Sequence, residues 1–260
     1  MSSKRDRNNR AREFWRELAI KAFWAVNENK FLLATILLAL IPLLWFRPWD
    51  TLITNGDFWL PLNPLNTIKQ LGSSWLENIS GGQINNMPFH IIPWLGFWSV
   101  LKLLSFSLSD IEKMWFVSIF LVGGVSMYFL TKEIFENKKG SWRNFLPVVL
   151  YLFNLYIMIN GFVTTNLLAY VFMPLLLLIY MKGIRQRDSF KFAFFLSLAT
   201  VFMASAAGYP PIYSIPFLLL FFFFVYSLIF RRKNYFSWKF NFQFLVLYLL
   251  FNAWWIYPFV

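Results

Sequence analysis

The feature that most constrains this chain is a series of long apolar runs separated by short basic stretches. The first run covers 31–46, and six more follow residue 113. The later runs are 114–131, 144–160, 168–181, 192–208, 212–230 and 240–260. A helix crosses a ~30 Å hydrocarbon core with about 20 mostly apolar residues, and flanking aromatic residues can complete the shorter runs. The runs predict an all-α protein, a polytopic transmembrane helical bundle of about seven spans.

The positions of the basic residues predict an orientation. Four segments, 1–30, 132–143, 182–191 and 231–239, together hold 20 of the 24 Lys and Arg residues. If the N-terminus is cytoplasmic and each run crosses once, all four segments face the cytoplasm, as the positive-inside rule requires. A net charge of +12 on a soluble domain would suggest a nucleic-acid partner. Clustering between apolar runs instead indicates a multi-pass cell-membrane protein with no nucleic-acid partner.

The first 30 residues combine eight basic side chains with an apolar stripe that includes Phe14, Trp15 and Leu18. Such a pattern is typical of an amphipathic helix on an anionic leaflet, here the cytoplasmic one. A signal peptide is the alternative, but the basic stretch is long and the apolar run begins only at Phe31. The chain has no cysteine, which excludes disulfides and thiolate chemistry.

Residues 47–113 are expected to form one large external loop. Making 87–106 a further span would place the basic residues of 132–143 outside, against the charge rule. Two segments of the loop, 64–79 and 91–106, instead show apolar stripes at helical spacing, with Ser99, Lys102 and Ser105 on the polar side of the second. We therefore expect two interfacial helices in this loop, followed by six spans over 114–260.

The chain contains no phosphate loop, zinc spacing or nucleophile elbow, and none of the expected spans holds an Asp, Glu, Lys or Arg within it. The lack of ionisable groups in the spans argues against an ion-coupled carrier. Chemistry is then expected from the carboxylates of the external loop. They are Asp50, Asp57, Glu77, Asp110 and Glu112.

Asp57 is the candidate catalytic residue. It follows the turn Asn55-Gly56 and precedes Phe58 and Trp59. A carboxylate partly desolvated beside aromatic rings has a raised pKa and can accept a proton from a substrate hydroxyl. The plainer alternative is an Asp that bonds its own turn or caps a helix.

The candidate substrate-binding residues are Asp50, His90, Lys69 and Lys102. Asp50 is the nearest acid to Asp57, and His90 is the only histidine of the chain. Lys69 and Lys102, like Lys113, lie in the loop where a lipid phosphate would bind, although solvated cations are the plainer interpretation. One histidine and no cysteine argue against zinc chemistry, so no metal site is predicted.

The arrangement of one span, a large external loop with an early Asp, and many later spans resembles the GT-C class of membrane glycosyltransferases. Gly56-Asp57, Pro61, Pro64 and Trp75 carry part of the likeness, which is to the mycobacterial-type arabinofuranosyltransferase group and its archaeal and bacterial relatives. The remaining motifs are Gly81-Gly82, Tyr151-Leu152-Phe153-Asn154-Leu155-Tyr156, Leu168-Ala169-Tyr170, Pro174-Leu175-Leu176 and Asn252-Ala253-Trp254-Trp255.

The resemblance implies an enzyme that transfers a sugar from a polyprenyl-phosphate-linked donor to a glycan or glycolipid acceptor of the cell envelope at the outer membrane face. It also implies that Asp57 is the general base. The class is often associated with an acidic pair or a divalent metal, and only Asp50 lies near Asp57 in the sequence. Such enzymes commonly have more spans and a soluble domain, so the chain is expected to be the N-terminal part of a longer protein. The alternatives are a non-enzymatic flippase for lipid-linked glycans and a membrane scaffold subunit.

Overall fold

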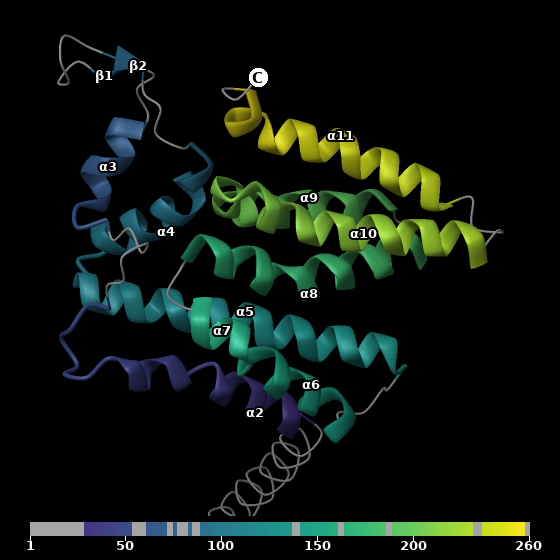
Figure 1. Ribbon diagram of the computed structural model, residues 1–260, viewed down its shortest axis with the longest axis horizontal. Helices are drawn as coiled ribbons and strands as arrows, with labels where there is room; N and C mark the ends of the chain where they lie inside the picture. The colour runs from purple at the N-terminus through teal and green to yellow at the C-terminus, as the bar shows by residue number, and fades with distance from the viewer. Residues whose placement is uncertain are drawn as a thin grey trace, which may run out of the picture.

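The computed structural model describes residues 29–53, 61–71, 75–76, 83–84, 89–136, 141–160, 164–185, 189–230 and 236–257. Apart from one short strand pair, the regular structure in these ranges is helical. The long helices lie side by side, roughly along one axis, and the short elements α3, α4 and β1–β2 lie at one end (Figure 1). The expectation of a helical membrane protein is confirmed at this level.

Four helices are long and apolar enough to cross a membrane: 108–134, 167–185, 189–208 and 210–230. They correspond to α5 (Leu108–Ile134), α8 (Thr164–Arg185), α9 (Ser189–Met203) with the 3-10 turn η3 (Ala204–Gly208), and α10 (Pro210–Phe230). Helix α8 is central and packs against α5, α9, α10 and α11. A last helix, α11 (Phe236–Ile256), has the same length as α10 but carries Asn241, Gln243 and Asn252 within it.

Two of the expected spans are interrupted. The run 31–46 forms helix α2 (Lys30–Leu38) and then the 3-10 turn η1 (Ile41–Trp45), with Pro42 at its start. The run 144–160 forms α6 (Trp142–Leu152) and α7 (Leu155–Asn160). Asn154 separates this second pair because its Oδ1 accepts the Ile157 N–H, as a capping side chain does. The seven crossings therefore stay a prediction, of which four are supported by helix length.

Helix α5 begins six residues before the expected start of the span at residue 114. Ser107 is the N-cap: its hydroxyl oxygen accepts the Asp110 N–H at 3.1 Å and donates to the Asp110 carboxylate at 2.6 Å. An acid in the first turn also complements the helix dipole. Glu112 and Lys113 consequently belong to a membrane-length helix and are buried in it. The expected span 114–131 itself holds no ionisable residue, but the helix that contains it buries Glu112 and Lys113 near its start.

Segment 47–113 contains two short helices whose bounds and faces differ from those expected. Helix α3 (Pro64–Leu71) does not extend to residue 79 as expected, because Trp75 and Leu76 form strand β1 (Trp75–Leu76). Strand β1 pairs antiparallel with β2 (Gln83–Ile84). Helix α4 (Ile92–Leu103) follows the 3-10 turn η2 (Phe89–Ile91). Ser99 is buried against α3, where it donates to the Pro64 carbonyl at 3.1 Å, whereas Val100 and Leu103 are exposed.

A tight turn connects α4 to α5. The Phe106 N–H bonds the Leu101 carbonyl and the Ser105 N–H bonds the Lys102 carbonyl, with Ser105 at a φ of 67°. This is the Schellman arrangement, which closes a helix with one left-handed residue. It leaves only a short link before Ser107, so α4 is fixed beside the start of α5.

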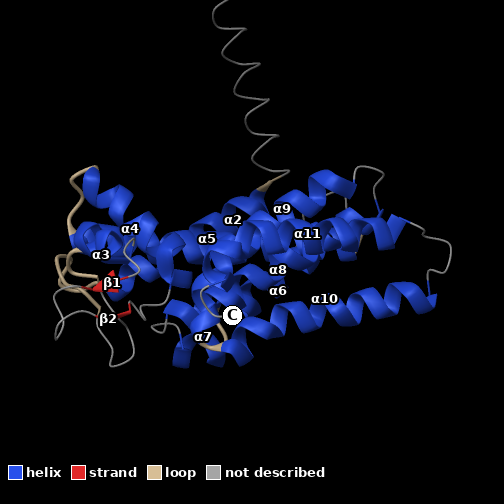
Figure 2. Cartoon of the chain, turned by 90° about the horizontal axis from the view of Figure 1, so that it is seen from above, coloured by secondary structure: helices blue, strands red, loops and turns tan. Residues whose placement is uncertain are grey.

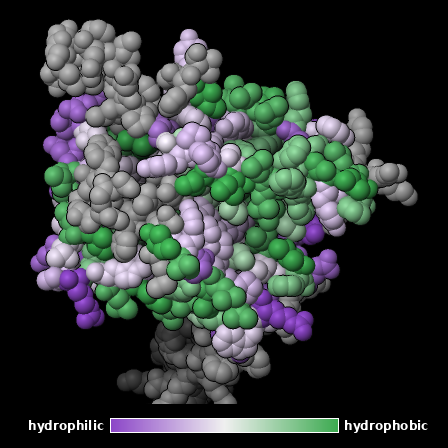
Figure 3. Space-filling view, in the orientation of Figure 1, coloured by the Kyte–Doolittle hydropathy of each residue, from purple (hydrophilic) through white to green (hydrophobic). Residues whose placement is uncertain are grey.

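The surface of the bundle is consistent with a lipid environment. Large apolar areas cover the face seen in Figure 3, with strongly hydrophilic residues mostly toward its two ends. Helix α10 lies at the edge of the bundle, away from the layer that contains α9 and α11 (Figure 2). Only 17% of the most apolar 18-residue stretch of α10 is buried inside the protein. Phe221, Phe222 and Phe230 are exposed on this helix. These phenylalanines are suited to contact with lipid.

Candidate functional site

The two ends of the bundle differ in their charge. At one end, Arg185 at the end of α8 bonds Glu133 at the end of α5 at 2.7 Å, and both side chains are partly exposed. Phe31 of α2 contacts Trp142 of α6, and Ser189 of α9 bonds Gln243 of α11, so these helix ends lie at the same level. We call this the basic end. The opposite end contains the start of α5, η2 and η3, and we call it the loop end.

The most unusual group at the loop end is Glu112. Its side chain is completely buried, with a relative exposure of 0%. Oε2 accepts the backbone N–H of Ile53 at 3.0 Å, while Oε1 has no hydrogen-bond partner among the described residues. A buried carboxyl with an unused oxygen carries a desolvation cost. Such a group is retained in membrane proteins chiefly where it has a function.

Lys113 lies beside it and is also buried. Its ammonium nitrogen is 4.1 Å from the ring centre of Trp49, 5.7 Å from that of Phe46 and 3.5 Å from an oxygen of Asp110. Nζ donates no hydrogen bond within the described part of the chain. A Lys ammonium has three donors, so this cation, held by aromatic faces and one carboxylate, is chemically suited to an anionic group.

The first turns of α5 also fix the segment that leads to Asp57. The Ser109 hydroxyl lies 3.2 Å from the Trp49 carbonyl and 2.9 Å from the Thr51 carbonyl, and Glu112 holds the N–H of Ile53. Two side chains of α5 therefore contact the backbone of this segment at Trp49, Thr51 and Ile53. Asp57 itself lies outside the described residues, and the structure does not test its predicted role.

His90 joins η2 to η3 in the interior of the loop end. Its carbonyl accepts the Ser205 hydroxyl at 3.2 Å, and a Cβ at Gly208 would approach its Nε2 to 2.9 Å. Burial lowers the pKa of His90 from its ordinary value of 6.5 to about 4 because the charged imidazolium would lose its hydration. This packing favours a neutral, structural histidine, although it does not test the predicted substrate contact.

The other predicted substrate contacts lie apart from this cluster. Asp50 and Lys69 are exposed, and Lys102 is partly buried, with its ammonium 3.5 Å from the Phe106 carbonyl. No ion pair within the described ranges connects any of them to Glu112 or Lys113. Among the described residues, no group of three or more His, Asp or Glu side chains could hold a metal ion.

Two motifs of the family resemblance come together in space. Tyr151 and Asn154, at the break between α6 and α7, contact Tyr170 on α8. The Tyr151 and Tyr170 rings stack with centres 4.3 Å apart, and Asn154 donates to the Tyr170 hydroxyl at 2.6 Å and to the Tyr151 carbonyl at 2.9 Å. Because Asn154 and Tyr170 are engaged within the protein, the cluster stabilises the interruption rather than offering free donors to a ligand.

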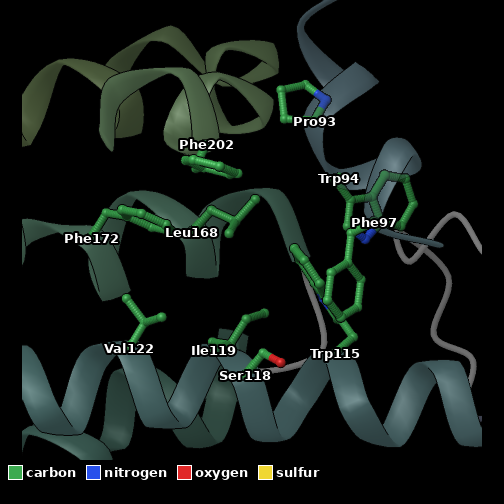
Figure 4. A pocket seen from close by; sticks show the side chains of 10 residues that line it. All are labelled: Pro93, Trp94, Phe97, Trp115, Ser118, Ile119, Val122, Leu168, Phe172 and Phe202. Carbon is green, nitrogen blue, oxygen red and sulfur yellow. The ribbon is translucent and has the colours of Figure 1, made fainter. Parts of the chain in front are cut away.

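A small apolar pocket of about 190 Å³ lies between α4, α5, α8 and α9, in the half of the bundle nearer the loop end (Figure 4). Trp94 and Phe97 of α4 and Trp115 of α5 form one side of it, and Phe172 and Phe202 lie at another. The pocket begins one helical turn after Glu112, because Trp115 follows that residue by three positions on α5.

Comparison with family models, with curated proteins and with solved structures gives no match. Glu112 and Lys113 are the candidate residues that sequence reasoning did not select. The available signal was the serine of Ser107-Leu108-Ser109-Asp110, an N-cap motif that starts the helix early and places the following Glu-Lys pair inside it.

Proposed function

We propose that this chain is a membrane glycosyltransferase of the GT-C kind, which transfers a sugar from a polyprenyl-phosphate donor to a glycan or glycolipid acceptor at the outer face. The observation that carries the proposal is the buried Glu112–Lys113 pair at the loop end, above an apolar pocket and at the base of the segment that leads to Asp57. The sequence motifs quoted above support the choice of class.

The chemistry requires few protein groups. The acceptor hydroxyl attacks the anomeric carbon of the donor sugar, the bond from that carbon to the phosphate oxygen breaks, and the lipid phosphate leaves with the electron pair. The hydroxyl proton passes to a carboxylate, for which we propose Asp57. A cation near the leaving phosphate stabilises its charge. Lys113 is suited to this role because its ammonium is desolvated and, within the described residues, is held by the Asp110 ion pair and aromatic faces without a hydrogen bond.

The roles of the exposed candidates follow from their accessibility. Asp50, Lys69 and Lys102 are proposed as contacts to the sugar or phosphate head group at the surface. Glu112 is proposed as a positioning residue, since it holds the backbone of Ile53. We further propose that the basic end and the N-terminus are cytoplasmic, which follows from the positive-inside rule.

The test is a transfer assay with the full chain in liposomes. Decaprenyl-phosphoryl arabinofuranose with a radiolabelled sugar is the donor, a synthetic arabinofuranose oligosaccharide is the acceptor, and the label in the oligosaccharide is measured. Asp57→Asn is expected to lower the rate at least ~100-fold, the usual contribution of a general base. Glu136→Gln changes an exposed acid near the basic end and is the matched control, expected to retain the wild-type rate.

Equal rates for Asp57→Asn and wild type would remove Asp57 as the base. Absence of transfer by the wild-type chain, together with movement of a fluorescent lipid-linked glycan between liposome leaflets, would replace the enzyme with a flippase. Absence of both activities would favour the scaffold subunit.

A further inference from the structure

Two neighbouring helical segments each expose a stripe of apolar side chains. Helices α2 and α6 lie against each other, since the Phe31 ring centre is 5.5 Å from that of Trp142 and 5.8 Å from that of Phe145. Both lie at the lower side of the bundle in Figure 1, and α11 lies at the upper side. The exposed residues recur at helical spacing. They are Leu33, Leu37, Leu40 and Leu44 on α2 and η1, and Trp142, Leu146, Leu150 and Phe153 on α6 and just after it.

Basic side chains lie where these two stripes begin, at the basic end. Lys30 is the first residue of α2 and Arg143 the second of α6, and both are exposed. Lys132, in the last turn of α5, is partly buried. The end of α5 lies beside the start of α6, because the Thr131 hydroxyl is 3.2 Å from the Asn144 carbonyl. We call Lys30, Lys132 and Arg143 the basic corner.

The charges of the basic corner are not neutralised by the protein. None of its three members forms an ion pair within the described ranges. Glu133, which follows Lys132 in the sequence, instead bonds Arg185 of α8 at 2.7 Å. The exposed Glu136 can offset at most one of the three positive charges. The corner therefore keeps a net positive charge and favours an anionic group.

The length of the α6 stripe agrees with a lipid chain. From Trp142 to Phe153 the stripe extends ~17 Å along the helix axis, close to half of a ~30 Å hydrocarbon core. Trp142 is an exposed aromatic residue of the kind that lies at the level of the lipid head groups, and basic side chains at that level attract anionic lipids. A soluble anion would use the cations alone, whereas a phospholipid of one leaflet also covers the stripes.

We propose that the basic corner binds an anionic phospholipid of the adjoining leaflet, with the phosphate group between α2, α5 and α6 and the acyl chains along the two stripes. The site lies at the end of the bundle opposite Glu112 and is independent of the proposed sugar transfer. The charge of the corner selects the head group, and the stripes make a lipid the ligand instead of free phosphate.

The experiment compares two photoactivatable lipids. The full chain is placed in phosphatidylcholine nanodiscs that contain a trace of phosphatidylglycerol or phosphatidylcholine with a diazirine in one acyl chain, and adducts are located by mass spectrometry. On residues 33–44 and 142–153 the phosphatidylglycerol probe should label at least ~25-fold more, because two cations near the membrane surface contribute about fivefold each. Unlabelled phosphatidylglycerol should compete, and soluble glycerophosphoglycerol should not.

Single substitutions test the corner. Lys132→Gln and Arg143→Gln should each lower the labelling ratio about fivefold, while Lys132→Arg keeps the charge and should retain the ratio. Lys239→Gln is the matched control, because it removes the same charge from an exposed position near the start of α11. It should label like the wild type.

Three results would overturn the inference. Equal labelling by the two probes would show that the corner does not select an anionic lipid. A loss in Lys239→Gln as large as that in Lys132→Gln would assign the preference to the net charge of the whole molecule. Competition by glycerophosphoglycerol would show a site for the head group alone.

Discussion

The basic end and the loop end use the same residue types in opposite ways. At the basic end, Arg185 and Glu133 pair at the surface, where water screens them and the pair adds little to stability. At the loop end, Glu112 and Lys113 are removed from water, and each retains polar atoms without a hydrogen-bond partner within the described ranges. The comparison teaches that the count of Lys and Arg residues predicts an orientation in the membrane, whereas the burial of a charge points to the candidate site.

The two ends also differ in what holds the helices together. Near the basic end, α8 and α11 meet at a glycine, because Gly183 lies directly against the ring of Phe240. At the loop end, polar contacts such as Glu112 to Ile53 and Ser205 to His90 make the connections. Four predictions distinguish close apolar packing near the basic end from polar contacts at the loop end. They are given from the largest expected effect to the smallest.

Gly183→Ala should have the largest effect. The added Cβ would lie 2.3 Å from Cε2 of Phe240, so α8 and α11 must separate. We expect a loss of about 3 kcal/mol in the free energy of unfolding, the upper range for overpacking. Gly96→Ala on α4 meets no atom within 4 Å and is the control. SDS titration in mixed micelles measures both, and equal stability of the two variants would contradict the packing argument.

Glu112→Gln should lower stability by about 2 kcal/mol, because an amide oxygen is a weaker acceptor than a carboxylate for the buried N–H of Ile53. Glu133→Gln makes the same chemical change on the same helix at the basic end. Its effect should be below about 1 kcal/mol because the ion pair is partly exposed. The same titration applies, and a larger loss for Glu133→Gln would reverse the comparison.

His90 makes the loop end sensitive to acid. Its pKa falls from 6.5 to about 4 on burial, so the unfolded chain binds a proton more readily than the folded one. Stability is then complete above pH 6.5, falls as the pH is lowered toward 4, and levels off below. The expected loss is about 1 kcal/mol by pH 5.5. Thermal unfolding between pH 7.5 and 5 measures it, and the slope should decrease in His90→Gln.

Arg185→Gln is expected to have the smallest effect, roughly 0.5 kcal/mol at low salt and less at 1 M salt. Thermal unfolding at both salt concentrations provides the measurement. A loss as large as that of Glu112→Gln, and independent of salt, would show that the basic end also depends on its charges.

Much of the helical architecture could be predicted because apolar runs and basic clusters are local features of the sequence. The runs that became α8, α9 with η3, and α10 were located correctly within a few residues. The interruptions were missed because they depend on tertiary contacts: Asn154 separates α6 from α7 while its amide bonds Tyr170 on another helix. Periodicity cannot reveal a partner 16 residues away.

The candidate site was only partly predictable. The loop carboxylates and lysines were identified as a group, but nothing local distinguishes Glu112 or Lys113 from Asp50 or Lys69. Their difference is burial, which arises when 49–53 folds over the start of α5. Asp57 lies outside the described residues and stays a prediction.

The interruptions of the helical runs have a consequence for hydration. The changes from α2 to η1, from α6 to α7 and from α9 to η3 each fall toward the loop end of their run. Helix ends leave amide and carbonyl groups without partners in the helix, and these attract water or side chains. Backbone amides at these three interruptions should therefore exchange with deuterium faster than those in the uninterrupted middle of α5 or α8.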